Sequence, residues 1–438
     1  MVFETERELF ALIIGYRVRE ARIRKHMSQS ELGQGLGSQS MISLIESGKQ
    51  LPPADVLSIL VDRLEEPLLA EYVPALQSGR ITIADVSASN HSILLDVLRT
   101  RRGRWNETHG QVALHLCYHY YTNQMFEIAR ELSIMIREHL PDHVPFYAEA
   151  SFLLGSSLLF VQEYQQAEAA LRDAERRADA LREDVRGRLF YNLGYLYTEN
   201  DEQGLALWYA KNAVETFHRN LDFGRYSKSL GLLGCIQGRL GRLEDARDTL
   251  ELCYEISGKW GISEVDRGRI EATLAGILAH LEQYELAKAW ADRAKHTSAS
   301  SGDIRTQCTM YLAFVQIYQH EGDVKLVVDA IHKSVHAAEL TNDRHQIAQS
   351  QLIAALYLPD EDERLQAAKQ AYEITAGTNL HIEHALAAEV LAQIYERQNV
   401  KSEAIHYQKV ALQSYRDYIE KNSMFKGIIQ HLPRHTVL

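Results

Sequence analysis

The sequence predicts an all-α protein that has a short N-terminal domain followed by a long superhelical solenoid of helix pairs. Three observations predict this fold class. Residues from about 107 to 420 repeat with a period close to 40 residues. Residues 1–66 carry short helical patterns that turn residues interrupt. Alternation of β-branched residues over more than four positions occurs only at residues 80–86, beside a glycine, which is too little for a convincing strand. We therefore expect three parts: a domain at 1–66, a helical connector at 67–106, and a repeat domain of about eight repeats at 107–438.

Composition limits the possible functions. The chain has 438 residues, and 46% of them are hydrophobic. Its net charge of −12 excludes a protein that is basic overall and coats nucleic acid, but it is compatible with a local basic patch. The four cysteines are scattered and form no CxxC pair, so neither a disulfide framework nor a zinc ribbon is expected. The longest apolar stretch, residues 151–161, is too short to cross a membrane, and the first ten residues are acidic where a signal peptide is basic. We expect a cytoplasmic protein with no membrane partner.

The repeats become visible when the chain is aligned with itself. In each unit a large apolar residue precedes a position that is usually small, and these positions are separated by 38 to 41 residues. A second small residue follows about 12 residues later. Small residues on the faces of two antiparallel helices let the helices approach closely, so each unit is expected to be a helix pair that packs on its neighbours. The first set is Cys117, Gly155, Gly194, Gly234, Ala275, Ala313, Ile353 and Ala392, and the second is Ala129, Ala167, Ala206, Ala246, Ala287 and Ala404.

This small-residue pattern resembles the tetratricopeptide repeat. The third unit shows it well, with Leu193-Gly194-x-x-Tyr197 followed by Ala206 and Ala213. The sixth and seventh units are degenerate, and the period is about five residues longer than the usual repeat. Other all-α arrays also have units of about 40 residues. The sequence therefore supports a solenoid of helix pairs more strongly than it supports tetratricopeptide repeats in particular.

The N-terminal domain carries its own local signals. Ser28 and Glu31 form a capping box that starts a helix, which is expected to end at Gly37. A second helix is predicted from Ser38 to Glu46, with Gly48 as its left-handed C-terminal residue. Pro52 and Pro53 then open a further helix over residues 54–64. Short helices joined at a glycine turn are typical of the helix-turn-helix motif.

Residues 14–19 (IGYRVR), 28–33 (SQSELG) and 42–49 (ISLIESGK) also resemble the phage-repressor type of helix-turn-helix. Gly33 departs from the family, which usually has alanine there. The resemblance implies that Arg22 pairs with Glu46 as a structural brace. It also implies a recognition helix that begins at Ser38 and enters the major groove, with Gln39 as the best candidate for an adenine edge. The DNA-binding residues expected from this placement are Arg17, Gln29, Ser38, Gln39, Ser40, Met41, Ser43 and Lys49.

Residues 15–30 carry five basic residues against Glu20, a local charge of +4 that could attract DNA phosphates. A charge run of this kind is often only a solvated helix face. The adjoining capping box, turn and terminating glycine favour the DNA-binding interpretation. One helix-turn-helix domain contacts few base pairs, so two copies of the domain are expected on a two-fold symmetric operator of double-stranded DNA.

The order of this basic domain and about eight repeats resembles the RRNPP family of bacterial regulators. That resemblance implies a homodimeric transcription factor whose DNA affinity is set by a short signalling peptide in the concave surface of the repeats. Inward-facing repeat positions then give the candidate peptide-binding residues. They are Arg188, Tyr191, Asn192, Tyr195, Lys228, Arg269, Gln307, Tyr311 and Gln351.

The sequence predicts no enzyme, no cofactor and no metal site. It has no nucleophile elbow or phosphate-binding fingerprint, and the helical pair His115 and His119 has no evident third ligand. Two alternatives to the peptide-controlled regulator remain open. One is an adaptor whose solenoid grips a partner protein, with or without DNA binding. The other is an enzyme modulator similar to the Rap proteins, although those begin with a helical bundle.

Overall fold

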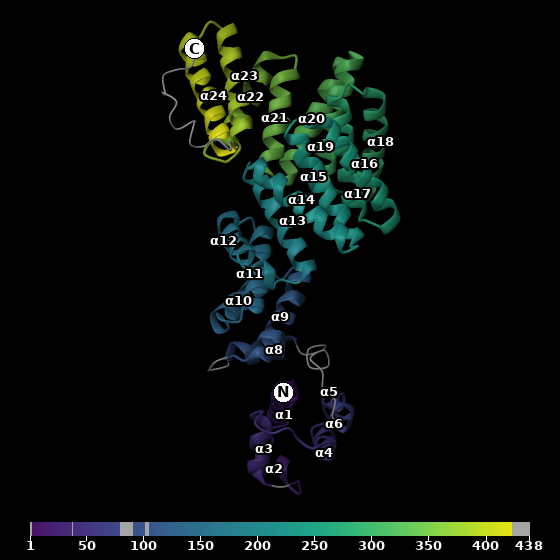
Figure 1. The fold of residues 1–438 in the computed structure, drawn as a ribbon, viewed down its shortest axis with the longest axis vertical. Helices are drawn as coiled ribbons and strands as arrows, with labels where there is room; N and C mark the ends of the chain where they lie inside the picture. The colour runs from purple at the N-terminus through teal and green to yellow at the C-terminus, as the bar shows by residue number, and fades with distance from the viewer. Residues whose placement is uncertain (1, 37, 79–90, 101–104, 423–438) are drawn as a thin grey trace. The chain divides into compact units, whose positions relative to one another are not determined.

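The computed structural model describes residues 2–36, 38–78, 91–100 and 105–422 (Figure 1). The chain divides into two compact units, residues 1–181 and 182–438. Every regular element in the described ranges is helical, so the predicted all-α fold class is confirmed. The one strand-like segment of the sequence, residues 80–86, lies outside the described residues. None of the described helices is long and apolar enough to cross a membrane.

The first unit opens with a small helical domain that we call the head, residues 2–64. Its apolar side chains converge because α1 and α3 pack together, and Ile14, Val18, Ile42 and Ile45 are all fully buried. The helix over residues 54–64 begins and ends where the sequence predicts. The helices of the head are α1 (Val2–Arg24), α2 (Gln29–Gly33), α3 (Gln39–Glu46) and α4 (Ala54–Leu64).

The predicted end of α2 is wrong. The helix stops at Gly33 instead of continuing toward Gly37, which itself lies outside the described residues. Two glycines explain the early end, because each weakens a helix by about 1 kcal/mol and Gly35 adopts a left-handed φ of +75°. The turn into the predicted recognition helix is therefore longer, and Leu36 within this turn is half-buried.

The rest of the first unit contains short connecting helices and two helix pairs. The pairs are held by buried apolar residues such as Leu132, Phe152 and Leu171. The elements are α5 (Pro67–Ala70), α6 (Val73–Ser78), α8 (His91–Thr100), α9 (Glu107–Thr122), α10 (Phe126–His139), α11 (Val144–Phe160), α12 (Tyr164–Glu175) and the 3₁₀ turn η1 (Ala178–Ala180).

The second unit is a run of helix pairs, each packed against the next. The first helices of its pairs are α13 (Glu183–Glu199), α15 (Phe223–Arg239), α17 (Glu264–His280), α19 (Ile304–Glu321), α21 (Arg344–Tyr357) and α23 (His381–Arg397). Their partners are α14 (Gln203–Arg219), α16 (Leu243–Trp260), α18 (Tyr284–Ser301), α20 (Val324–Thr341), α22 (Glu361–Thr375) and α24 (Lys401–Asn422).

The predicted role of the small residues is confirmed at the glycines. A Cβ atom added to Gly155 or Gly234 would lie 2.6 and 2.5 Å from the side chains of Leu171 and Leu250 on the paired helices. At Gly194 it would lie 3.2 Å from the backbone nitrogen of Ala210. The seventh unit differs, because Ile353 at the aligned position is only partly buried while the alanines that follow it are fully buried.

The turns inside the pairs share one backbone device. In seven of the eight described pairs, a residue one or two positions after the first helix adopts a left-handed conformation, which ends the helix and reverses the chain. The α21–α22 turn is the exception, because Leu358 after α21 is extended. Only two of these residues are glycine, so the turn is not marked by a single residue type in the sequence. The residues are Gln124, Gln162, Asp201, Gly241, Glu282, Gly322 and Asn399.

Candidate DNA-binding and ligand-binding sites

The recognition helix α3 presents a polar, uncharged surface at its start. Ser38, Gln39, Ser40 and Ser43 are exposed and Met41 is half-buried. Ser38 occupies the N-cap position without capping the helix through its side chain, so the hydroxyl is not used by α3 itself. The predicted major-groove residues therefore lie together on one accessible helix end.

A buried brace holds α3 against the rest of the head. Arg22 donates to both carboxylate oxygens of Glu46, at 2.5 and 3.0 Å, and also to the carbonyl of Met27. Gln29 donates from Nε2 to Glu46 at 2.9 Å. The hydrogen bond that Arg22 donates to Glu46 raises the pKa of Arg22. The Arg22–Glu46 pair implied by the resemblance is confirmed. Gln29, one of the predicted DNA-binding residues, joins this brace through its amide.

The predicted +4 charge is largely neutralised within the head. Arg24 forms an ion pair with Glu66 at 3.0 Å, and Lys25 forms one with Glu65 at 3.0 Å. With Arg22 also paired, three of the five basic residues are held by acids that lie 24 to 42 positions away or just beyond α4. Sequence reasoning missed the pairs of Arg24 and Lys25, because Glu66 and Glu65 stand outside the window over which the charge was counted.

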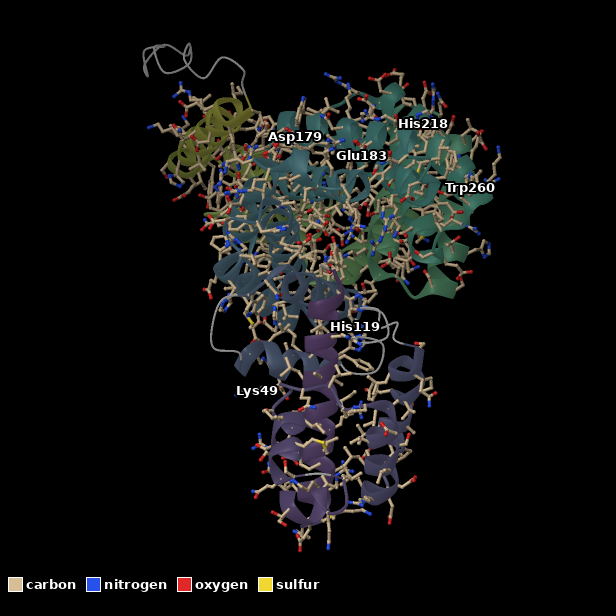
Figure 2. All side chains as sticks on the ribbon, turned by 60° about the horizontal axis from the view of Figure 1, so that its bottom comes forward. Lys49, His119, Asp179, Glu183, His218 and Trp260 are labelled. Atoms are coloured by element: carbon tan, nitrogen blue, oxygen red, sulfur yellow. The ribbon has the colours of Figure 1, made fainter. Side chains whose placement is uncertain are left out.

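The other predicted cations of the head lie in different surroundings. Arg17 is half-buried, and its guanidinium lies 5.8 Å from the ring centroid of Tyr72. Lys49 is exposed directly after Gly48, as Figure 2 shows. Gly48 has the predicted left-handed φ, of +68°, and a Cβ atom there would lie 2.5 Å from Leu12. Lys49 is thus placed by a glycine that the packing of α1 requires.

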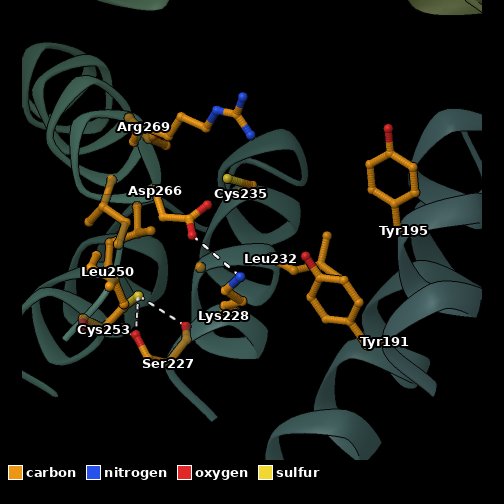
Figure 3. A pocket seen from close by; sticks show the side chains of 14 residues that line it. Tyr191, Tyr195, Ser227, Lys228, Leu232, Cys235, Leu250, Cys253, Asp266 and Arg269 are labelled. Carbon is orange, nitrogen blue, oxygen red and sulfur yellow. Dashed lines mark hydrogen bonds and ion pairs between the residues drawn. The ribbon is translucent and has the colours of Figure 1, made fainter. Parts of the chain in front are cut away.

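The second unit contains a cavity of about 250 Å³ formed between the first helices of three successive pairs. Its walls combine apolar side chains from α15 to α17, such as Leu232 and Ile270, with a few polar and charged groups. Figure 3 shows Tyr191 and Tyr195 on α13 to one side, and Lys228, Asp266 and Arg269 across from them. Such a mixture of an apolar wall and a few charges is typical of a ligand site. The structure thus brings Tyr191, Tyr195, Lys228 and Arg269 of the predicted peptide-binding set together.

Each cation of the cavity faces an acid. Lys228 lies 3.5 Å from Asp266. Arg269 pairs with Asp303, the N-cap residue of α19, at 3.1 Å. These side chains are partly accessible, since those of Lys228 and Arg269 are 57% and 48% exposed. The pair of Lys228 is exposed on both sides and contributes little stability, so a ligand carboxylate is able to compete for this cation. The Asp303 side chain is only 12% exposed and accepts from Arg269 through both carboxylate oxygens, so that pair is the firmer of the two.

Burial changes the pKa values of the two tyrosines of the cavity. It raises the pKa of Tyr191 to about 12, with a further contribution from the negative charge of Asp266. Burial also raises the pKa of Tyr195 to about 12, helped by Glu199. Both phenols therefore keep their protons at neutral pH and are available as hydrogen-bond donors to a ligand carbonyl.

The remaining predicted peptide-binding residues do not line this cavity. Arg188 and Asn192 are half-buried on α13, and Gln307 and Tyr311 are half-buried on α19. The ring of Tyr311 lies 5.9 Å from the ammonium of Lys333. Gln351 on α21 is only 5% exposed, so its side chain lies within the helix packing.

A second group of charges, which sequence reasoning did not single out, lies at the C-terminal ends of α13 and α15 and the N-terminal ends of α19, α21 and α23. His345 pairs with Glu383 at 3.1 Å, and Arg305 lies 3.8 Å from Asp343. Arg239 donates to the carbonyl of Thr198 at 3.2 Å. Burial raises the pKa of Glu199, which the charge of Arg239 partly offsets. The residues come from repeats far apart in the sequence, so no local spacing signals the group.

No group of three His, Cys, Asp or Glu side chains within the described ranges is arranged to hold a metal ion. His115 and His119 lie on α9 beside His91 of α8, whose ring stacks on that of His119 with centroids 3.6 Å apart. Burial and the two neighbouring histidines lower the pKa of His91. The cysteines are free thiols, and burial raises their pKa values, to about 12 for Cys117.

Comparisons with known proteins agree with these two parts. Residues 18–69 match the helix-turn-helix family. No curated protein sequence matches the chain. A Rap protein in complex with competence and sporulation factor has a similar structure, with a TM-score of 0.57 and 13% identity, over 84% of this chain and 100% of that one.

Two further structures share the fold. The apo form of the quorum sensor NprR from B. thuringiensis gives a TM-score of 0.55 at 14% identity, over 80% of this chain and 99% of that one. A Rap conjugation gene regulator of a plasmid, in complex with the Phr* peptide, gives 0.51 at 14% identity, over 89% and 100%.

The fold and the match together define a helix-turn-helix protein with a tetratricopeptide-like solenoid. Its solenoid shares the fold of the Rap and NprR structures, which agrees with the solenoid of helix pairs that the sequence predicts.

Proposed function

We propose that this chain is a cytoplasmic transcriptional regulator whose affinity for DNA is controlled by a short signalling peptide bound on the inner surface of the second unit. The observation that carries the proposal is the cavity in which Tyr191, Lys228 and Arg269 meet, from the first helices of three successive pairs, in a chain that also has a helix-turn-helix head.

The head supplies the DNA-reading surface. Gln39 stands exposed near the N-terminus of α3, where an amide is able to donate to and accept from an adenine edge. The neighbouring serines discriminate bases poorly, and three of the five basic residues of the head are already paired. A single head therefore gives weak binding, and the regulator acts as a homodimer on two half-sites.

The cavity supplies the peptide site. The two tyrosines donate to peptide carbonyls, while Leu232, Leu250 and Ile270 bury apolar side chains of the ligand. Lys228 exchanges Asp266 for a peptide carboxylate, and the exchange costs little because both side chains of this ion pair are exposed. Arg269 stays paired with Asp303, and its half-exposed guanidinium adds positive charge to the site.

The experiment is a DNA-binding titration of the full-length protein with and without peptide. A preferred duplex is first selected from random double-stranded DNA, and a ligand is selected from a random library of short linear peptides. Fluorescence anisotropy then measures the affinity for the duplex. We expect the peptide to change that affinity by about 5- to 150-fold, the usual range of coupling between two sites.

Two variants separate the parts of this proposal. Gln39→Ala should weaken binding to the selected duplex and leave peptide binding unchanged. Lys228→Met should weaken peptide binding and leave DNA binding without peptide unchanged. Equal DNA affinity at zero and saturating peptide would overturn the peptide control.

An adaptor that grips a partner protein is the second candidate. The pairing of Arg24 with Glu66 and of Lys25 with Glu65 favours the adaptor, because it reduces the positive charge of the head that is free for DNA. Co-purification of one stoichiometric protein partner, unaffected by Gln39→Ala with Arg17→Ala, would support the adaptor. The absence of any selected duplex in the first experiment would do the same.

A further inference from the structure

The end of α24 reaches back to the first helix pair of the second unit. Asn422 accepts a hydrogen bond from the backbone N–H of Gln203 at 2.9 Å and donates to the carbonyl of Asp201 at 2.9 Å. The ammonium of Lys421 donates to the carbonyl of Asn200. We call this group of residues, 200, 201, 203, 421 and 422, the terminal clasp.

Contacts of this kind depart from the ordinary build of a solenoid. Helix pairs in such arrays touch only their neighbours, so the first and last pairs are normally independent of each other. The bonds of the terminal clasp join residues that are 219 to 221 positions apart. They therefore connect the first pair of the unit, α13 and α14, with the last, α23 and α24.

The clasp satisfies backbone groups that the helices leave open. Gln203 is the first residue of α14, and the side chain of the N-cap residue Glu202 does not cap that helix. Asn422 supplies the missing acceptor from the far end of the unit. Lys421 places its positive charge at the C-terminal carbonyls of α13, where a cation is favoured by the helix dipole. Both ends of the α13–α14 turn thus depend on α24.

The clasp is also close to unsatisfied buried groups. Oδ2 of Asp201 and Oε1 of Gln203 are buried without a hydrogen-bond partner. Burial and, to a smaller extent, the negative charge of Glu383 raise the pKa of Asp201 to about 6, although Gln203, Arg239 and Lys421 act to lower it. Tyr418 of α24 also lies near these two acids, and His345 pairs with Glu383. Buried polar atoms without a partner cost free energy, so the clasp holds less tightly than its three hydrogen bonds alone would suggest.

We propose that the terminal clasp holds the second unit as one closed superhelical turn, and that its release lets the last helix pairs move away from the first. Release of the clasp would also affect the cavity, because the clasp holds the turn that directly follows α13, and α13 lines the cavity with Tyr191 and Tyr195. The proposal requires neither DNA nor a peptide and stands apart from the proposed function.

The test measures a distance across the clasp in the full-length protein. Spin labels are placed at Gly204→Cys and Gln413→Cys, two exposed positions on α14 and α24, in a Cys235→Ser background. Double electron–electron resonance then gives the distribution of distances between the labels. We expect one narrow distribution when the clasp is intact, and a broader one with a longer mean after Lys421→Met combined with Asn422→Ala.

Lys409→Met is the matched control, because it removes an exposed lysine from the same helix away from the clasp. Asn422→Asp is a second opening variant of almost equal size, which cannot donate to the carbonyl of Asp201 and adds charge beside an acid. If circular dichroism shows that the double variant has lost helix, the distances measured in Asn422→Asp test the proposal instead. Unchanged distributions in a folded opening variant would overturn the proposal.

Discussion

The head and the cavity both contain arginine or lysine paired with an acid, but the pairs differ in exposure. In the head, the side chains of Arg22 and Glu46 are 14% and 4% exposed. In the cavity, those of Lys228 and Asp266 are 57% and 31% exposed. A buried ion pair is important for stability, because removal of one partner leaves the other charge buried and unpaired. An exposed pair is weak and exchangeable, so it suits a ligand site. Similar residue types therefore stabilise the fold in one region and, in the function proposed above, bind a ligand in the other.

The largest effect is expected from Arg22→Met. It leaves Glu46 buried without its cation, which should destabilise the head by about 3 kcal/mol. Hydrogen exchange of α2 and α3 in the full-length protein measures this loss. Arg19→Met, at an exposed position of the same helix, should change the exchange little. Equal exchange in the two variants would contradict the structural role of the brace.

Gly15→Ala should have the next largest effect. An added Cβ atom would lie 2.2 Å from the carbonyl oxygen of Ile45 and 3.1 Å from that of Glu46, so α1 would have to move away from α3. We expect a loss of about 1 to 3 kcal/mol, measured by the same exchange experiment. Gly276→Ala is the matched change, because a Cβ atom there meets open space inside a helix. It should stabilise α17 by roughly 0.5 to 1 kcal/mol.

A smaller effect that depends on pH is expected from Asp201→Asn. Because the pKa of Asp201 rises from 3.8 to about 6 on folding, the folded protein binds more protons than the unfolded chain between these values. Wild-type stability should therefore fall as the pH rises through this window, and the variant should not share that fall. Thermal melting between pH 4.5 and 7.5 should show the variant gaining on the wild type as the pH increases. A constant difference would show that Asp201 does not titrate in this range.

The smallest effect on stability is expected from Lys228→Met. The ion pair with Asp266 is exposed, so its loss should change the free energy of unfolding by less than about 1 kcal/mol. Denaturant unfolding measures this, with Lys288→Met, which breaks another exposed pair, as the control. A loss as large as that of Arg22→Met would remove the contrast between the two regions.

Local signals in the sequence predicted much of the fold. The capping box of Ser28 and Glu31 forms as expected, with both reciprocal hydrogen bonds, because its residues are only three positions apart. The repeated small residues predicted the helix pairs for a similar reason, since each acts on the helix next to it. The end of α2 was misjudged because the helix-weakening effect of Gly33 and Gly35 outweighed the helical pattern.

The candidate sites were harder to predict because they depend on residues far apart in the chain. Repeat position predicted Tyr191, Lys228 and Arg269, and the structure brings them to one cavity. The repeat pattern of the sequence did not indicate that Asp303 pairs with Arg269, or that Gln351 is buried. The terminal clasp joins positions more than 200 residues apart, and no periodic pattern reveals such a contact.

The packing of Trp290 on α18 has a practical consequence. Its indole lies partly buried between two apolar clusters of the second unit and meets the ring of Tyr254 edge to face, with centroids 4.8 Å apart. Arg293 lies over the same indole at 4.7 Å. Because indole emission responds to both polarity and nearby charge, the chain carries an intrinsic fluorophore at the seam between α16 and α18, and sliding along that seam should be visible without any dye.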